Sequence, residues 1–377
     1  MPGVLSEYVE LPKKTKKEIK IAMMTPWKVA CGVALHAELI GHEWVRMGYK
    51  LKVFAPIEKV TQPVTGVDEP YVIRCYTMNR EPVKGLLAPL YLDPQPLLEA
   101  EYNLFIVQNL ELMPMGDLLK IWPEIKKRAA TVLVIHEGYL PPYPEFYSFD
   151  WDAIVCFDER YAAEFAKKFP QSRIHIIPYP CHPWKPGKKE RARLKLGLPL
   201  NKKIVLSYGI SVHQHFVTLP VLEQLSHTHD LIYLVLPAEG KSEIVEKAQA
   251  RFDFIEVREA VPSIGELYTY LHAADALLLY KQSPNIVVCS TIFLCAGSGC
   301  PIVISEGRYT ESLGEEVLRY SDFDELGKVL NGVFEGHGVN ELALRKFLQR
   351  YDASLIARQF LELGHLLGME ESAAIAV

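Results

Sequence analysis

A regular alternation along the chain narrows its fold more than any other feature: short apolar runs give way to segments with apolar residues at helical spacing. The first run, 19–24, is followed by Val33, Ala37 and Ile40 along one helical face, and that segment ends at Gly48, a residue suited to a left-handed helix cap. Such alternation is typical of parallel βαβ units. The expected strands are 19–24, 51–56, 103–107, 131–136, 153–157, 173–178, 203–208, 231–236, 254–257, 276–280 and 301–304.

A proline-rich segment divides this alternation into two halves. Residues 178–187 carry four prolines in ten residues, which resists both helix and central strand. A chain of 377 residues also exceeds what one hydrophobic core usually supports, so we expect two domains that meet near 180–190. Because open parallel sheets bind ligands outside the carboxyl ends of their strands, two such sheets facing each other predict an interdomain cleft.

Two segments depart from the alternation. Residues 57–98 are proline-rich and irregular, and long irregular segments in compact domains are often functional; the sequence leaves open whether this one is an acceptor loop. Apolar residues at helical spacing over roughly 339–366 predict a long helical tail after the second half.

Composition excludes several classes of protein. A formal net charge of −5 and a pI near 6.2 argue against a general nucleic-acid binder. Seven scattered cysteines without a C-x-x-C pair indicate neither a disulfide framework nor a zinc cage, so no metal site is expected. Without an apolar stretch of signal or membrane-span length, the sequence predicts a cytoplasmic protein. A short basic cluster precedes the first expected strand and is formed by Lys13, Lys14, Lys16 and Lys17. It suits either peripheral contact with an anionic membrane or a solvated segment before that strand.

Six landmarks, taken in order, carry a resemblance to a known family. They are KIAMMTPWKVACGVALHAELIGHEWVRMGYKLKVFAP, TVLVIH, IHIIPYPCHP, ERARLKLGLPLNKKIVLSYG, AADALLLY and GSGCPIVIS. Together they resemble the GT-B glycosyltransferases, in particular the retaining glycosyltransferase family four, over nearly the whole chain. The resemblance implies an α/β fold with two Rossmann-like, doubly wound parallel-sheet domains facing an interdomain cleft.

The same resemblance implies a domain plan and an activity. The plan is an N-terminal extension (1–17), an acceptor domain (18–182), a nucleotide-sugar domain (183–340), a C-terminal helix that returns to the first domain (341–366) and a tail (367–377). The implied activity moves a hexose from a nucleotide-diphosphate sugar to a hydroxyl acceptor with retention of configuration. It requires no nicotinamide or metal cofactor, the nucleotide sugar being a co-substrate.

Two positions in the first half are candidate ligand contacts. Gly32, after Cys31, lies where backbone N–H groups at a helix N-terminus can approach a phosphate or a sugar hydroxyl. His136 ends an expected strand at the cleft, and the resemblance places a sugar-contacting histidine there. A simple turn at Gly32 and a packed histidine at 136 are the structural alternatives.

The second half departs from the family at the donor phosphates. The family presents an arginine and, five residues later, a lysine, and these positions read as Ile210 and His215. Gly209 and Ser211 remain as hydrogen-bond donors, and a protonated His215 replaces the lysine only at low pH or with a raised pKa.

The glutamate pair of the family is also absent. Its two positions align with Ile286 and Leu294. A substitute anion site is inferred from polar residues around the start of the expected helix, with a capped helix as the structural alternative. The residues of this substitute site are Lys281, Ser283, Asn285, Ser290 and Thr291.

Two other functions stay open. A sugar-nucleotide epimerase or hydrolase on the same fold would need carboxylates clustered in the cleft, and the candidates are Glu38, Glu137, Asp158 and Glu159. A non-catalytic GT-B binding protein would explain the losses at 210, 215, 286 and 294.

Overall fold

The N-terminal domain is built on a seven-stranded parallel sheet. The computed structural model describes residues 18–57, 66–78, 90–209, 212–238, 242–259 and 262–374, so the predictions on Lys13, Lys14, Lys16, Lys17, Ile210 and Ser211 lie outside the described residues. The strand order is β3-β2-β1-β4-β5-β7-β8. The strands are β1 (Lys20–Met24), β2 (Lys50–Pro56), β3 (Val72–Tyr76), β4 (Leu104–Gln108), β5 (Ala130–Val134), β7 (Ala153–Cys156) and β8 (Ile174–Ile176). The helices between them are α1 (Gly32–Arg46), α2 (Gln95–Glu99), α3 (Met115–Lys126) and α4 (Glu159–Phe165).

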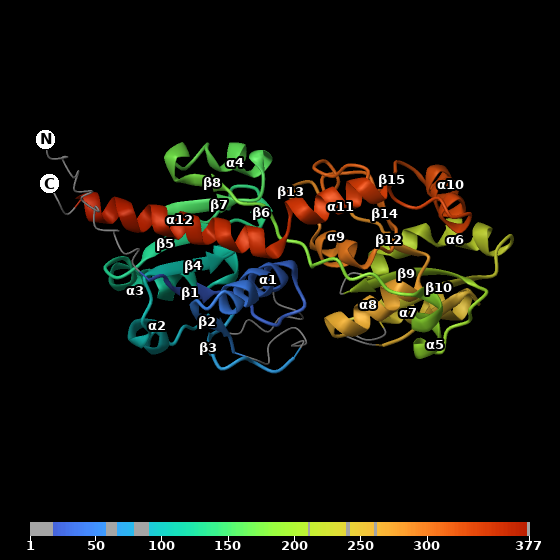
Figure 1. Ribbon diagram of the computed structural model, residues 1–377, viewed down its shortest axis with the longest axis horizontal. Coiled ribbons are helices and arrows are strands. Elements are labelled where there is room, and N and C mark those ends of the chain that lie inside the picture. Colours follow the sequence, from blue (N-terminus) through green and yellow to red (C-terminus); the bar gives the residue numbers. More distant parts are fainter. Residues whose placement is uncertain are drawn as a thin grey trace, which may run out of the picture.

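The C-terminal domain repeats this plan with a six-stranded parallel sheet in the order β11-β10-β9-β12-β14-β15. Its strands are β9 (Lys203–Gly209), β10 (Leu231–Pro237), β11 (Ile255–Val257), β12 (Ala276–Leu279), β14 (Ile302–Ser305) and β15 (Leu318–Tyr320). Its helices are α5 (Lys189–Leu196), α6 (Leu219–Ser226), α7 (Glu243–Arg251), α8 (Ile264–Ala273), α9 (Ser290–Cys295) and α10 (Phe323–Phe334). The two domains lie side by side along the long axis of the molecule (Figure 1).

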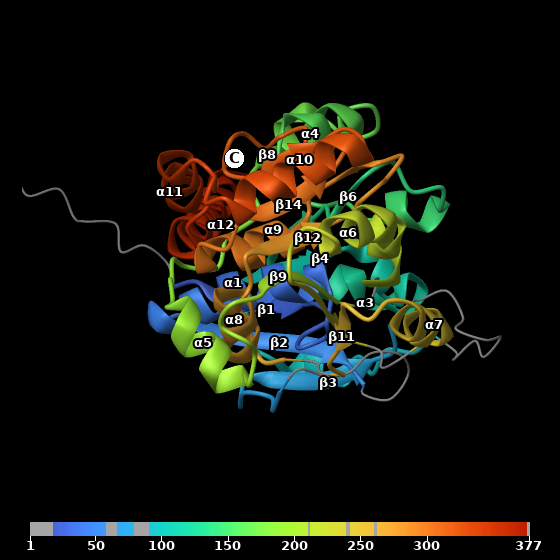
Figure 2. The same cartoon turned by 90° about the vertical axis from the view of Figure 1, so that its right-hand side faces the viewer.

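Side-chain alternation along the strands of the second sheet supports a helix layer on each face. In β9, Leu206 packs in the same core as α5, α8 and α9, whereas Val205 packs with α6, α7 and α10. Figure 2, seen from the C-terminal domain, shows α5 and α8 on one side of β9 and α6 and α10 on the other. Burial on both faces explains why these strands read as continuous apolar runs in the sequence.

Two sequence predictions about secondary structure are corrected. The stretch 57–98 is not irregular throughout, because its described part contains β3, paired with β2, and α2. The tail at 339–366 is not one helix but two, α11 (Glu341–Arg350) and α12 (Ala353–Ala374), separated at Tyr351 and Asp352. Apolar spacing continues through this break, so periodicity alone did not reveal it.

The chain crosses between the domains twice at one place. The Cys181 amide donates to the Tyr351 carbonyl at 2.6 Å, and Cys181 forms a parallel bridge with Asp352. After the second crossing, α12 packs along α1, where the Trp44 indole N–H donates to the Ala357 carbonyl at 2.9 Å. Figure 1 shows α12 running back over the N-terminal domain.

The domains also touch through a small antiparallel sheet. β6 (Glu137–Gly138) follows β5 in the N-terminal domain and pairs with β13 (Ile286–Val287) in the C-terminal domain. A Cβ atom on Gly138 would lie 2.6 Å from the Ile286 Cβ, so only glycine permits this approach. Ile286 therefore takes part in a contact between the domains, at the position that aligns with a glutamate in the family that the sequence resembles.

Candidate functional site

A cavity of about 440 Å³ lies between the two domains. Its N-terminal wall is the loop 28–31 and one face of α1. Its C-terminal wall is formed where β9, β10 and β12 end and where α8 and α9 begin. The carboxyl ends of both sheets thus meet at one cavity, which is where open parallel sheets bind ligands.

The start of α1 forms the anion-attracting part of the N-terminal wall. Cys31 is the N-cap, and its Sγ accepts from the Ala34 amide at 3.5 Å. Gly32 begins this 15-residue helix and faces α9, because a Cβ there would lie 2.8 Å from the Ser290 Oγ. The amides of a first helical turn carry partial positive charge, so the predicted glycine position lies where a phosphate would be stabilised.

Lys281 supplies a full positive charge from the opposite wall. It follows β12 and lines the cavity, and its amide donates to the Ser305 Oγ at 2.9 Å. Among the residues the structure describes, its ammonium makes no ion pair. Gly209 also lines this wall and has a φ of 114°, a left-handed conformation that favours glycine. Lys281 and the first turn of α1 therefore suit a ligand with negative charge.

His215 lines the same wall but does not replace a lysine. Its side chain is buried, and burial together with the nearby Lys281 charge lowers its pKa to about 3. The proposal of a protonated His215 is thus corrected, because the imidazole is neutral at physiological pH. The Tyr280 amide can only donate, and it lies 3.0 Å from the Nδ1 atom of His215. The Tyr280 carbonyl oxygen lies 3.1 Å from the same Nδ1 atom, so the neutral ring has a backbone partner at Nδ1 in either tautomer.

The substitute anion site predicted around α9 is only partly assembled. Ser290 and Thr291 line the cavity beside Lys281. Ser283 and Asn285 are absent from its wall and lie in the loop before β13, where the Asn285 amide donates to the Ser283 Oγ at 3.1 Å. Ser283 and Asn285 are thus close to α9 in the sequence but are not among the residues that line the cavity.

His136 lies behind the cavity wall, in a buried aromatic cluster. It is 8% exposed, and its Nε2 lies 2.9 Å from the Gln108 Oε1. The ring of His36, on α1, is 5.2 Å away. Burial, with a smaller contribution from His36, holds the pKa of His136 well below its usual value. The imidazole is thus neutral and packed against α1, and it is not among the residues that line the cavity.

Sequence reasoning missed one face of α1. Leu35, Glu38 and His42 follow Cys31 at helical spacing, and all four line the cavity. Projecting the helix from its glycine loop would have identified this face. Sequence reasoning named Glu38 only as a loose candidate for a carboxylate cluster.

That cluster of carboxylates does not form. Glu38 lines the cavity, whereas Glu137 belongs to β6 and Asp158 caps α4 and pairs with Arg160 at 2.7 Å. Glu159 is exposed on α4. Within the described part of the chain, no group of three His, Cys, Asp or Glu side chains could hold a metal ion.

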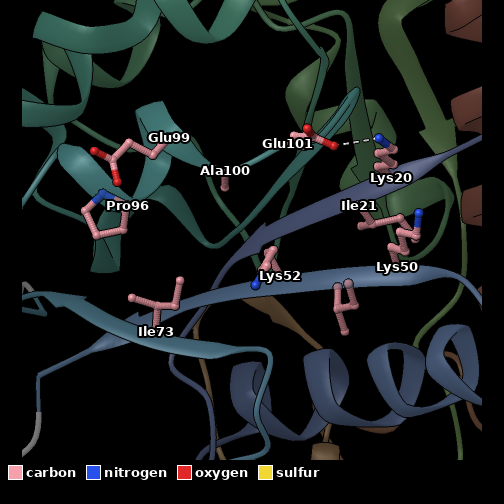
Figure 3. Close-up of a pocket in the computed structure, with 10 residues that line it drawn as sticks. Lys20, Ile21, Lys50, Lys52, Ile73, Pro96, Glu99, Ala100 and Glu101 are labelled. Carbon is pink, nitrogen blue, oxygen red and sulfur yellow. Dashed lines mark hydrogen bonds and ion pairs between the residues drawn. The ribbon is translucent and has the colours of Figure 1, made fainter.

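A second hollow, of about 700 Å³, lies at the amino ends of the strands of the N-terminal sheet, opposite the interdomain cavity. Lys20, Lys50 and Lys52 come from the starts of β1 and β2, and Figure 3 shows Lys20 paired with Glu101, at 2.7 Å. The amino ends of parallel strands are not where such sheets bind ligands. The interdomain cavity, although smaller, is therefore the candidate site.

No helix in the described ranges is both long enough and apolar enough to cross a membrane.

Known structures share this architecture. No protein-family model matches the chain. The sucrose-phosphate synthase of Thermosynechococcus elongatus is similar, with 14% identity and a TM-score of 0.67 over 94% of this chain and 100% of that one. A glycosyltransferase from Rickettsia africae has 13% identity and a TM-score of 0.66 over 93% and 98% of the two chains.

A third similar structure was solved with ligands. It is the pneumococcal O-GlcNAc transferase GtfA in complex with UDP and GlcNAc, with 11% identity and a TM-score of 0.62 over 93% of this chain and 99% of that one. Identities this low show the fold alone. The predicted fold class is confirmed: the chain has the two-domain GT-B fold of glycosyltransferases.

Proposed function

We propose that this protein is a glycosyltransferase that moves a sugar from a nucleotide-diphosphate sugar to a hydroxyl acceptor. One observation carries the proposal: the unpaired Lys281 and the first turn of α1 line the same interdomain cavity. The leaving group of such a transfer is a nucleoside diphosphate, on which negative charge develops. Fixed positive charge at that point stabilises the transition state.

The assignment of roles follows from the two walls. Lys281, Ser290 and Thr291 are proposed to contact the diphosphate, together with His215 in its Nε2–H tautomer. The apolar part of the wall, which includes Leu236 and Ile264, is proposed to cover the nucleoside. The solved neighbours named above include a transferase holding UDP, which supports a nucleotide donor here as well.

Three finer parts of the proposal rest on the sequence resemblance. They are a hexose as the transferred sugar, retention of its anomeric configuration, and independence from metal ions. NMR of the first-formed product distinguishes retention from inversion. A transfer rate unchanged by EDTA is expected, because Lys281 and α1 supply the positive charge; a rate restored only by added Mg²⁺ or Mn²⁺ would contradict that.

The first experiment is a thermal-shift screen with UDP-, GDP- and ADP-sugars, followed by a hydrolysis and transfer assay with each donor that binds. We expect one nucleotide to raise the melting temperature. Lys281→Ala should weaken its binding about tenfold or more, because charge-assisted hydrogen bonds to phosphate contribute about 1.5–3 kcal/mol each. Lys328→Ala, on α10 and outside the cavity, is the matched control.

Two results would contradict parts of this proposal. If no nucleotide changes the melting temperature at millimolar concentration, the assignment of this cavity as the donor site is wrong. Binding without depletion of any nucleotide sugar would instead favour the non-catalytic binding protein.

A further inference from the structure

Glu38 is the single carboxylate among the described residues that line the interdomain cavity. It lies on α1, seven residues beyond the Cys31 cap. At the helical rise of 1.5 Å per residue, it stands about 10 Å along the helix axis from the anion-attracting first turn. The carboxylate is therefore separated from the positive end of α1 by two helical turns.

The environment of Glu38 leaves part of its carboxylate available to a ligand. Its Oε1 accepts from the Lys28 amide at 3.0 Å. Burial raises its pKa to about 7; Lys28 opposes this shift and Glu69 adds to it. The titratable and charged groups around it are Lys28, His42, Glu69, Tyr71 and Tyr179, with His215 and Lys281 on the opposite wall. Close to neutral pH, the group thus exists in both its charged and its neutral form.

The chemistry of the proposed donor decides what Glu38 can contact. A carboxylate repels phosphate oxygens but accepts hydrogen bonds from hydroxyl groups. The part of a nucleoside diphosphate adjacent to its phosphates is a ribose, whose 2′ and 3′ hydroxyls are neighbours and can donate to the same carboxylate. On the opposite wall, the side chains of Leu294 and Ile264 are apolar, and the Ser263 hydroxyl is engaged with Glu266 at the start of α8.

We infer that Glu38 binds the ribose hydroxyls of the donor nucleotide, so that the N-terminal domain recognises the nucleoside from across the cavity. This inference rests on the proposed function. The phosphates at Lys281 and the ribose at Glu38 would then tie the two domains to one ligand. Bound nucleotide would stabilise the observed arrangement of the domains.

The test is a calorimetric titration with UDP, GDP and ADP and with their 2′,3′-dideoxy counterparts. Glu38→Gln keeps an oxygen for the Lys28 amide and removes the charge. Glu43→Gln, on the same helix but outside the cavity, is the control. We expect Glu38→Gln to weaken binding of the preferred ribonucleotide about tenfold and to leave the dideoxy nucleotide unchanged.

A second readout uses pH. Hydroxyl donors favour the ionised carboxylate, and with a pKa of about 7 the ionised fraction of Glu38 rises about tenfold between pH 6 and pH 8. The ratio of ribonucleotide to dideoxynucleotide affinity should therefore rise with pH in the wild type. It should stay constant in Glu38→Gln, and the ratio cancels titration of the phosphates.

The outcomes separate this inference from the proposed function. Ribonucleotide binding that Glu38→Gln leaves unchanged, or equal weakening of both nucleotides, would overturn the ribose contact while the donor site stands. If Glu38→Gln weakens binding only of a complete nucleotide sugar, Glu38 contacts the transferred sugar, and the ribose contact is again overturned. Failure of every nucleotide to bind the wild type would overturn both.

Discussion

His36 is the residue whose burial has the clearest consequence for stability. It is fully buried on α1. Its ring packs against His136, Phe157, Tyr179 and Phe360. Burial lowers the pKa of His36 to about 3, with Gln108 opposing the shift. The His36 imidazole therefore binds a proton more weakly in the folded protein than in the unfolded chain.

This difference predicts an acid-labile fold. An unfolded histidine takes up its proton near pH 6.5, so the stability due to neutral His36 is complete above that pH and is lost as the pH falls toward about 3. The loss approaches about 1.4 kcal/mol per pH unit. Urea unfolding of the wild type and of His36→Phe, between pH 7.5 and 5, should show a shallower pH dependence in the variant. Equal slopes would contradict the assignment.

At the scale of elements, two ion pairs join α5 to the edge between β9 and β12, because Arg193 and Lys189 both pair with Asp275. Arg193 on α5 donates to Asp275 at 2.8 Å and to the carbonyls of Ala273 and Lys202. Asp275 also accepts from the Ile204 amide at 2.7 Å. The Arg193 side chain is 4% exposed. The Arg193–Asp275 pair thus satisfies backbone groups at the end of α8 and in the stretch 202–204, with its guanidinium almost fully buried.

Removing one partner of this pair should be costly. Arg193→Met leaves the carbonyls of Ala273 and Lys202 without this donor and leaves Lys189 as the remaining ionic partner of Asp275. Breaking a buried ion pair from one side typically costs about 3–5 kcal/mol, and because Lys189 stays in place we expect a loss at the lower end, about 3 kcal/mol. Lys195→Met, on the exposed side of the same helix, should change stability by less than about 0.5 kcal/mol. Chemical denaturation measures both variants. A small loss for Arg193→Met would mean that water replaces the guanidinium.

At the scale of the whole molecule, close approach between the domains depends on small residues. The Tyr179 hydroxyl donates to the Gly32 carbonyl at 2.6 Å, and Gly32 faces Ser290 across the interface. A Cβ on Gly32 would lie 2.9 Å from the Ser290 Cβ, a contact that side-chain rotation cannot relieve. The closed arrangement therefore requires glycine at the start of α1.

Gly32→Ala should consequently push the domains apart. Overpacking costs about 1–3 kcal/mol, which corresponds to about 5- to 150-fold weaker binding of a nucleotide that contacts both domains. Adding Ser290→Gly to this variant removes the clashing atoms and should raise the affinity to that of Ser290→Gly alone, which lacks the proposed hydroxyl contact to the diphosphate but has no clash. Calorimetry measures affinity, and small-angle scattering reports the opening. A double variant no tighter than Gly32→Ala would exclude the clash as the cause.

The sequence by itself determined the two-domain α/β plan, because strands buried on both faces must be continuously apolar and their crossover helices must carry an apolar stripe. It also identified Gly32, Gly209 and Lys281, which lie near the carboxyl ends of β1, β9 and β12, where chain position alone predicts ligand binding. The family landmarks added the GT-B arrangement, which the solved structures confirm.

Only the tertiary structure decided which side chains share the cavity. Whether His136 faces a ligand or α1, and whether His215 holds a charge, depends on burial by segments far away in the chain. Glu38 became a candidate because α8 and α9 of the other domain lie opposite its helix face. Local periodicity records which face of an element is apolar, but pKa and contact across a cleft arise from the packing of two domains, which no local pattern contains.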